Sequence, residues 1–152
     1  TTGKYLINNF KYFFKNMSSY PAILELNILK KNNVFIDKEL KLKIKTVKVK
    51  HGDIKCCAFI INNKCAYISD VSKIYTKDLK YFKNLNYFIV DCLRYNKHPS
   101  HYCLEDVLEL IKILKPQKTV LTNLHSDLDY KKLKEILPKN ILPAYDGMSF
   151  VL

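Results

Sequence analysis

The stretch Ala66-Tyr67-Ile68-Ser69-Asp70 runs from an apolar strand directly into a carboxylate, and Tyr87-Phe88-Ile89-Val90-Asp91 repeats this pattern further along. We therefore predict two buried strands that each end on an aspartate. In α/β proteins the loops that follow the carboxyl ends of strands converge and build the functional site. All four histidines come just after a predicted strand or in a loop from a strand to a helix; they are His51, His98, His101 and His125. Scattered histidines would not share this position, so we expect a site at one edge of a sheet.

The rest of the chain supplies the elements of an α/β (α+β) fold. Apolar residues that alternate with polar ones predict strands, and apolar residues at helical spacing predict helices. We predict strands over residues 23–28, 34–36, 41–50, 54–61, 65–69, 87–90, 119–121, 141–145 and 148–152, and helices over 3–14, 72–82, 104–114 and 130–137. The alternation changes parity at Thr46 and Val47, which predicts a bulge or bend in that strand, with His51 on the apolar face beyond it.

The composition predicts one basic, soluble domain. The chain has 152 residues, 48% of them hydrophobic, and 26 Lys plus Arg against 14 Asp plus Glu give a formal charge of +12. This length and apolar content suffice for a core and exclude a disordered polycation. Arg94 is the only arginine, although recognition of phosphate or guanine favours arginine. We attribute the charge mainly to compositional bias and partly to attraction of an anionic substrate.

The cysteines and the hydropathy pattern predict a cytoplasmic protein without a membrane partner. None of the five cysteines forms a C-x-x-C pair and their number is odd, which argues for reduced core thiols and against a disulfide framework or a cysteine zinc site. No apolar run approaches the roughly 18 to 20 residues of a membrane span, and no signal-peptide pattern is present.

His51, Asp70 and His125 form an imidazole, carboxylate and imidazole set on three successive strand ends. Imidazole suits Zn, Mn and Fe, and a carboxylate can bridge two ions, so this set is a candidate metal site. A surface or core position remains the alternative for each histidine taken alone. Asp127 and Asp129 lie next to His125 and are either carboxylates that orient the ligands or a solvated acidic turn.

The motif His98-Pro99-Ser100-His101 precedes the acidic first turn of the helix predicted over 104–114. One interpretation is a turn and a helix cap, with Ser100 or His101 near the N-cap position. The other is an imidazole that contacts a substrate phosphate or protonates a leaving group.

Several motifs in a fixed order resemble the metallo-β-lactamase-fold hydrolases, in particular the phosphodiesterase branch that includes the cyclic-phosphate phosphodiesterase of phosphonate catabolism. The motifs are Val49-Lys50-His51-Gly52, Ala66-Tyr67-Ile68-Ser69-Asp70-Val71-Ser72, Val90-Asp91-Cys92-Leu93-Arg94, His98-Pro99-Ser100-His101, Leu121-Thr122-Asn123-Leu124-His125-Ser126-Asp127-Leu128-Asp129-Tyr130 and Tyr145-Asp146-Gly147-Met148. The resemblance covers essentially the whole chain.

The resemblance implies an αββα sandwich with two divalent metal ions, Mn or Zn. It implies that the residue matching His51 binds one ion, that Asp70 bridges both, that His125 binds the second, and that His101 contacts the scissile phosphate or assists the leaving group. Further candidates for outer or substrate contacts are Asp91, Arg94, His98, Asp127 and Asp129.

Two departures from the family pattern bear on these assignments. Asn123 stands where many members have a histidine, and His125 follows two residues later. The family's H-x-H-x-D-H motif, which belongs to the N-terminal half of the fold, does not occur in residues 1–152. We therefore expect residues 1–152 to be the C-terminal portion of a single metallo-β-lactamase-like domain, with an incomplete ligand set of its own.

The leading hypothesis is a dinuclear-metal phosphodiesterase that acts on nucleotide-like or cyclic phosphate esters, with a small phosphorylated substrate as its partner. Alternatives with the same fold are a tRNA 3′-processing nuclease and a thioester or lactam hydrolase. An alternative of another class is a catalytically inactive basic module that binds RNA or another polyanion through residues 41–50. Because alternating lysines are ordinary on the solvent face of a strand, we do not expect nucleic acid as the partner. A homodimer is left open.

Overall fold

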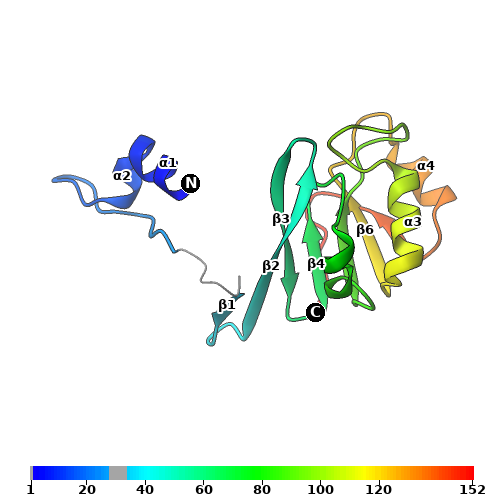
Figure 1. Cartoon of the computed structure of the whole chain (residues 1–152), viewed down its shortest axis with the longest axis horizontal. Coiled ribbons are helices and arrows are strands. Elements are labelled where there is room, and N and C mark those ends of the chain that lie inside the picture. The colour runs from blue at the N-terminus through cyan, green and yellow to red at the C-terminus, as the bar shows by residue number, and fades with distance from the viewer. Residues whose placement is uncertain (1, 28–33) are drawn as a thin grey trace. The chain divides into compact units, whose positions relative to one another are not determined.

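The computed structural model describes residues 2–27 and 34–152, which belong to two compact units. The N-terminal unit spans Thr1–Asn32 and the larger unit spans Asn33–Leu152 (Figure 1). Within the described ranges, no helix combines the length and the apolar composition that crossing a membrane requires.

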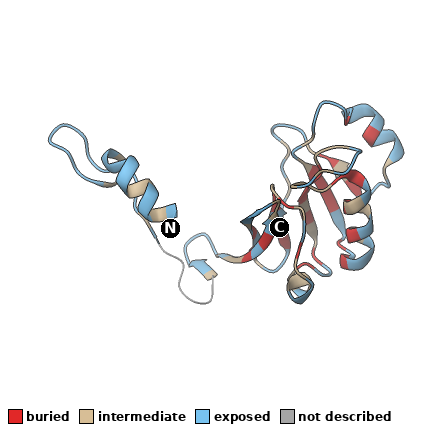
Figure 2. Cartoon of the chain, turned by 45° about the horizontal axis from the view of Figure 1, so that its top comes forward, coloured by how far each residue is buried: buried red, intermediate tan, exposed pale blue. Residues whose placement is uncertain are grey.

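The N-terminal unit contains two short helices, α1 (Thr2–Asn9) and α2 (Lys11–Phe14). Together they correspond to the helix predicted over residues 3–14, with an interruption at Phe10, whose backbone is not helical. Neither helix has a buried residue, and Figure 2 shows this unit without the red of buried positions. The unit therefore contributes no part of the hydrophobic core.

The strand predicted over residues 23–28 is wrong for residues 23–27, which are not in a strand; residue 28 lies outside the described residues. The backbone N–H groups of Ile23 and Leu24 both donate to the carbonyl of Phe13, at 3.0 and 2.9 Å. These two donors are therefore used by a carbonyl of α2 and not by a neighbouring strand.

The larger unit is built on one mixed sheet of seven strands that follow one another in sequence order. The first three pairs are antiparallel and the last three are parallel. The strands are β1 (Val34–Asp37), β2 (Leu42–His51), β3 (Ile54–Ile61), β4 (Cys65–Ile68), β5 (Tyr87–Asp91), β6 (Lys118–Thr122) and β7 (Ile141–Pro143). Because β2, β4, β5 and β6 run in the same direction, their carboxyl ends meet at one edge of the sheet. The predicted α/β class is confirmed.

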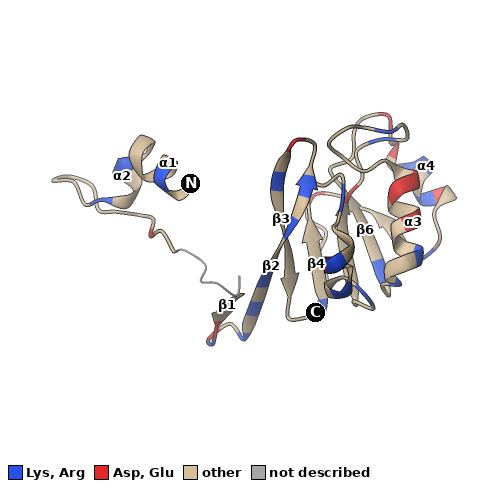
Figure 3. Ribbon diagram, viewed as in Figure 1, with Lys and Arg blue, Asp and Glu red and all other residues tan. Residues whose placement is uncertain are grey.

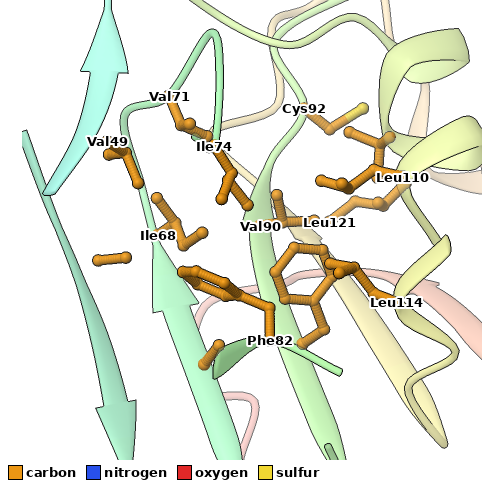
Figure 4. Packing of buried hydrophobic residues seen from close by; sticks show 14 of the residues in the cluster. Val49, Ile68, Val71, Ile74, Phe82, Val90, Cys92, Leu110, Leu114 and Leu121 are labelled. Atoms are coloured by element: carbon orange, nitrogen blue, oxygen red, sulfur yellow. The ribbon is translucent and has the colours of Figure 1, made fainter. Parts of the chain in front are cut away.

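Three helical segments connect the parallel strands and cover one face of the sheet. They are η1 (Thr76–Tyr81), a 3-10 helix, α3 (Leu104–Leu114) and α4 (Tyr130–Ile136). Right-handed crossovers that advance across a sheet in one direction all lie on the same face. Figure 4 shows Ile68 and Val90 of the sheet packed against Phe82 and Leu114, and all four side chains are fully buried.

The bulge predicted in the second strand is absent, since β2 pairs with β3 in one continuous register from Ile44↔Ile61 to His51↔Ile54. Lys45, Val47 and Val49 therefore share one face. The apolar residues change face because the cover changes along the strand: Val47 and Val49 lie in the core, whereas Lys45 lies beside Tyr81 of η1.

The prediction for the last strands is wrong beyond Pro143, because none of residues 144–152 is in a strand. The Met148 N–H closes a turn by donating to the Tyr145 carbonyl at 3.0 Å. The ring of Phe150 then stacks on that of Tyr87, with centroids 4.3 Å apart. The apolar residues at this end are thus used for ring packing rather than for a strand.

The sheet face opposite the helices is apolar and incompletely covered. Its register places Cys57, Phe59, Tyr67 and Ile89 on this side. Phe59 and Tyr67 are 38% and 39% exposed, whereas their neighbours on the helix face are buried. Contrary to the expectation of core thiols, Cys57 is exposed for the same reason, although Cys65, Cys92 and Cys103 are buried and all five are free.

Candidate metal centre

The carboxyl ends of β2, β4 and β5 bring three polar side chains to the same edge of the sheet, as the sequence predicts. His51 is the last residue of β2, Asp91 the last of β5, and Asp70 lies two residues beyond β4. The loop that follows β5 then brings His101 to the same place, because its Nδ1 lies 2.7 Å from Oδ2 of Asp91.

His51, Asp70 and His101 form a cluster in which one possible ligand atom of each lies within 4.8 Å of the others. The rings of His51 and His101 meet edge to face, with centroids 4.6 Å apart. Two imidazoles and a carboxylate are a donor set that suits Zn and Mn. The described side chains can therefore hold a divalent ion at this edge.

Hydrogen bonding orients His51 for this task. Its Nδ1 lies 2.7 Å from the carbonyl oxygen of Ser100, which can only accept, so the proton is on Nδ1 and the lone pair is on Nε2. A metal-binding histidine commonly donates its other N–H to a carbonyl or carboxylate in this way. The site thus fixes the tautomer that a metal requires.

Gly52 permits the close approach of Ser100 to the end of β2. It has a φ of +56°, and a Cβ built on it would lie 3.0 Å from the Cβ of Ser100. Its N–H donates to Oγ of Ser72 at 3.2 Å. A side chain at this position would strain the backbone and also displace the residue that orients His51.

Asp91 is completely buried behind His101 and accepts three hydrogen bonds. Besides His101, its donors are the N–H of Val71 at 3.0 Å and Nδ2 of Asn123 at 3.1 Å. Burial raises the pKa of Asp91, and the three hydrogen bonds oppose this rise. Because Asp91 accepts the hydrogen bond from Nδ1 of His101, it fixes the orientation of the His101 ring.

Asn123 contributes a contact that sequence reasoning did not assign. It has a φ of +61°, which asparagine tolerates better than most residues, and this turn directs Nδ2 to Asp91 and, at 3.4 Å, to the carbonyl of Ser69. The only sequence feature that could have indicated this role is that Asn123 directly follows Thr122, where many members of the family have a histidine.

Asp70 also has a hydrogen bond that orients it, because the Ser69 hydroxyl donates to its Oδ2 at 2.8 Å.

His98 lies beside the cluster, and Arg94 lies close enough to His98 to act on its charge. The ring of His98 is 5.2 Å from that of His101, and its Nδ1 lies 3.1 Å from Oγ of Ser100. Desolvation and then the positive charge of Arg94 lower the pKa of His98. The Arg94 side chain donates to the carbonyl of Lys97 at 3.2 Å, and its buried Nε has no partner among the described residues.

His125 does not join the cluster of His51, Asp70 and His101. It is 58% exposed, with its Nδ1 3.0 Å from Oδ1 of Asp127. Asp129 instead caps α4, since its carboxylate accepts from the N–H of Lys132 at 2.9 Å.

The N-cap of α3 is not formed by the residues of the His98 motif that the turn interpretation suggested. The N-cap residue is Cys103, and Asp106 accepts from its backbone N–H at 3.2 Å. Ser100 and His101 are therefore not at the N-cap: His101 belongs to the cluster, and the Ser100 carbonyl contacts His51.

Residues 1–123 match the family described as the beta-lactamase superfamily domain. The chain belongs to this family. The metallo-β-lactamase fold that the motifs imply is thereby confirmed, and the seven-stranded sheet with its helices is consistent with that sandwich. No curated protein sequence matches the chain significantly.

Solved structures agree with membership of the beta-lactamase superfamily. A diphosphatase from the PhnP family superposes with a TM-score of 0.82 at 25% identity, over 97% of this chain and 53% of that one. The metallo-beta-lactamase fold protein YhfI from Bacillus subtilis gives 0.70 at 15% identity, over 93% and 61%. The short form of human tRNase Z gives 0.59 at 16% identity, over 78% and 45%. The last two share the fold alone, and the chain spans about half the length of the diphosphatase.

Proposed function

We propose that the chain is the C-terminal portion of a metal-dependent hydrolase that cleaves phosphodiester bonds in nucleotide-like or cyclic phosphate esters. The observation that carries this proposal is the cluster of His51, Asp70 and His101 with the buried Asp91 behind it. The similarity to a diphosphatase of the PhnP family supports phosphoryl chemistry.

Each residue of the cluster has a role that follows from its contacts. His51 would bind an ion through Nε2, because Nδ1 is engaged by Ser100. Asp70 has two carboxylate oxygens and would bridge two ions, and His125 is our candidate for a ligand of the second. Two divalent ions, Mn or Zn, would activate a water molecule and neutralise charge on the phosphate.

His101 is positioned to serve the leaving group. Its Nδ1–H donates to Asp91, so the ring is fixed and Nε2 faces away from that carboxylate. An imidazole held in this way can deliver a proton to the departing oxygen, and the buried carboxylate stabilises the protonated ring. His98 lies next to His101, and we assign His98 and Arg94 to contact with the substrate phosphate.

The apolar sheet face supports the assignment of residues 1–152 to one part of a larger domain. Phe59 and Tyr67 lie on that face with more than a third of their surface exposed, and an open apolar face of this kind marks an interaction site. In the αββα architecture a second sheet packs there, at about 10 Å face to face. We propose that sequence encoded upstream supplies that sheet and the remaining ligands.

The test is hydrolysis of a bis-aryl phosphate by the gene product that contains this chain, with manganese or zinc added. We expect Asp70→Asn to lower kcat by at least about 100-fold, because an amide cannot bridge two ions. Asp78→Asn, in η1 and outside the cluster, should retain activity. A panel that includes an aryl thioester, a β-lactam and a diphosphate decides among the alternatives; turnover of only the thioester or the lactam would contradict the proposal.

A further inference from the structure

A polar cavity lies near the ends of the strands opposite to those that carry the metal centre. It has a volume of about 450 Å³ and is lined by Val34, Lys43, Lys45, Ile60, Asn63, Lys80, Tyr81, Lys83 and Leu85. Lys45 precedes His51 by six residues of β2, which corresponds to about 20 Å along a strand. The cavity is therefore separate from the cluster of His51, Asp70 and His101.

The charge of this cavity is entirely positive. Four lysines line it, no acidic residue does, and none of these lysines forms an ion pair with any residue in the ranges 2–27 and 34–152. The lysines come from two separate segments, β2 with Lys43 and Lys45, and the end of η1 with Lys80 and Lys83 just after it. In Figure 3 the blue of basic residues recurs along β2.

An aromatic ring holds two of these ammonium groups close together. Nζ of Lys45 lies 3.5 Å from the centroid of the Tyr81 ring, and Nζ of Lys80 lies 5.2 Å from it. The separation of the two nitrogens cannot exceed the sum of these distances, which is close to the Debye length of about 8 Å at physiological ionic strength. The two cations therefore repel each other, and the ring only partly offsets this.

The position of Lys45 is unusual for a solvated lysine. Its side chain is on the same face of β2 as Val47 and Val49, which are core residues, and Lys45 itself is half-buried. The Lys45 ammonium group lies against the Tyr81 ring, and no acidic residue lines the pocket or pairs with it among the described residues. An anion from outside would therefore meet positive charge that no carboxylate of the described residues neutralises.

We propose that this pocket binds an anion that carries two or more linked phosphate groups. Lysine ammonium groups bind phosphate as point charges, and four of them around one cavity match a ligand with several negative charges. The volume falls in the range of small-molecule sites. Val34, Ile60 and Leu85 provide an apolar floor that accepts an uncharged body attached to the phosphates, such as a nucleoside.

Calorimetric titration of the chain with tripolyphosphate tests this proposal, in buffer with EDTA so that the metal centre is not loaded. We expect Lys43→Gln with Lys83→Gln, both at exposed positions, to weaken binding about ten-fold or more. Lys131→Gln with Lys139→Gln removes the same charge from exposed positions on and beyond α4 and should change the dissociation constant less than two-fold.

Further arms separate the possible sources of binding. His51→Ala should leave tripolyphosphate binding unchanged, which keeps this result independent of the proposed hydrolase function. Stronger binding of ADP than of inorganic diphosphate would indicate that the apolar floor is used. Four results would each overturn the proposal. Two concern the variants: equal weakening by both lysine pairs, or loss of tripolyphosphate binding in His51→Ala. The other two concern the ligand: binding of an RNA oligonucleotide but not of tripolyphosphate, or no detectable binding of tripolyphosphate at millimolar concentration.

Discussion

The backbone carbonyl of Ser100 decides which nitrogen of His51 is available to a metal ion. It accepts the Nδ1 proton of His51 at 2.7 Å, and Gly52 makes room for it. A contact between residues separated by nearly fifty positions thus sets the chemistry of the cluster. Single substitutions at the residue scale can test this arrangement without removing a ligand.

Replacing Gly52 with alanine should lower both stability and metal affinity. The φ of +56° disfavours a side chain, and the new Cβ would lie 3.0 Å from Ser100. We expect the free energy of unfolding to fall by about 1 to 2 kcal/mol and zinc affinity to fall about ten-fold, because His51 loses its orientation.

Gly147→Ala is the matched control for this substitution. Gly147 also has a positive φ, +86°, but nothing lies within 4 Å of the added Cβ. Urea denaturation and a zinc competition assay should show a stability loss in both variants and an affinity loss only at Gly52. Equal zinc affinity in the two variants would contradict the role of Ser100.

The buried thiol of Cys65 should make stability depend on pH in the alkaline range. Burial raises the pKa of Cys65 from 9.0 to about 11. Between these values the unfolded chain loses the proton and the folded chain keeps it, so the free energy of unfolding falls as pH rises, by about 2 kcal/mol over the window. Urea denaturation from pH 8 to 11 should show a smaller decrease for Cys65→Ala than for the wild type; equal slopes would exclude this thiol as the cause.

The residues of the site were predictable only in part from the sequence. His51, Asp70, Asp91 and His101 follow strand ends, and topology brings strand ends together, so their convergence could be anticipated. The contacts that Ser100 and Asn123 make depend on loop backbone angles, including a positive φ at Asn123, that no periodicity records.

At the scale of elements, α3 is a helix whose bounds the sequence pattern predicts in full. The prediction of residues 104–114 matches the helix, because its apolar stripe and acidic first turn coincide. The bulge predicted in β2 was wrong because an alternating pattern does not show what covers each face of a strand, and this cover changes along β2. The strand predicted over residues 148–152 was wrong because these residues follow a turn and the Phe150 ring packs on that of Tyr87.

Shortening Leu114 in α3 should destabilise the larger unit strongly. Leu114 is fully buried beside Phe82 and Val90, so Leu114→Ala should lower the free energy of unfolding by about 2 to 5 kcal/mol. Ile113, its neighbour, is 54% exposed, and Ile113→Ala should cost less than about 1 kcal/mol. Denaturation curves that shift equally would contradict the packing of α3 on the sheet.

At the scale of the whole molecule, the two faces of the sheet differ in cover. The helices bury one face, while Phe59, Tyr67 and Ile89 occupy the other. The exposure of Phe59 and Tyr67 shows which face of the sheet the described residues leave open.

An open apolar face predicts self-association of the chain on its own. We expect sedimentation velocity to show concentration-dependent association of the wild type, because burying aromatic side chains is favourable by about 25 cal/mol per Å². Phe59→Thr with Tyr67→Thr should shift the chain towards monomer. Ile113→Thr, on the exposed side of α3, should not. If the wild type stays monomeric at high concentration, the sheet face with Phe59 and Tyr67 does not mediate self-association.

X-ray absorption spectroscopy of the zinc-loaded chain tests the central claim most directly, because it reports the atoms bound to the metal. Binding by His51 and Asp70 predicts nitrogen and oxygen ligands at about 2.0 to 2.2 Å with outer-shell scattering from imidazole. His51→Ala should remove one imidazole contribution. A sulfur ligand at about 2.3 Å, or a spectrum that His51→Ala leaves unchanged, would contradict the metal centre described for this edge of the sheet.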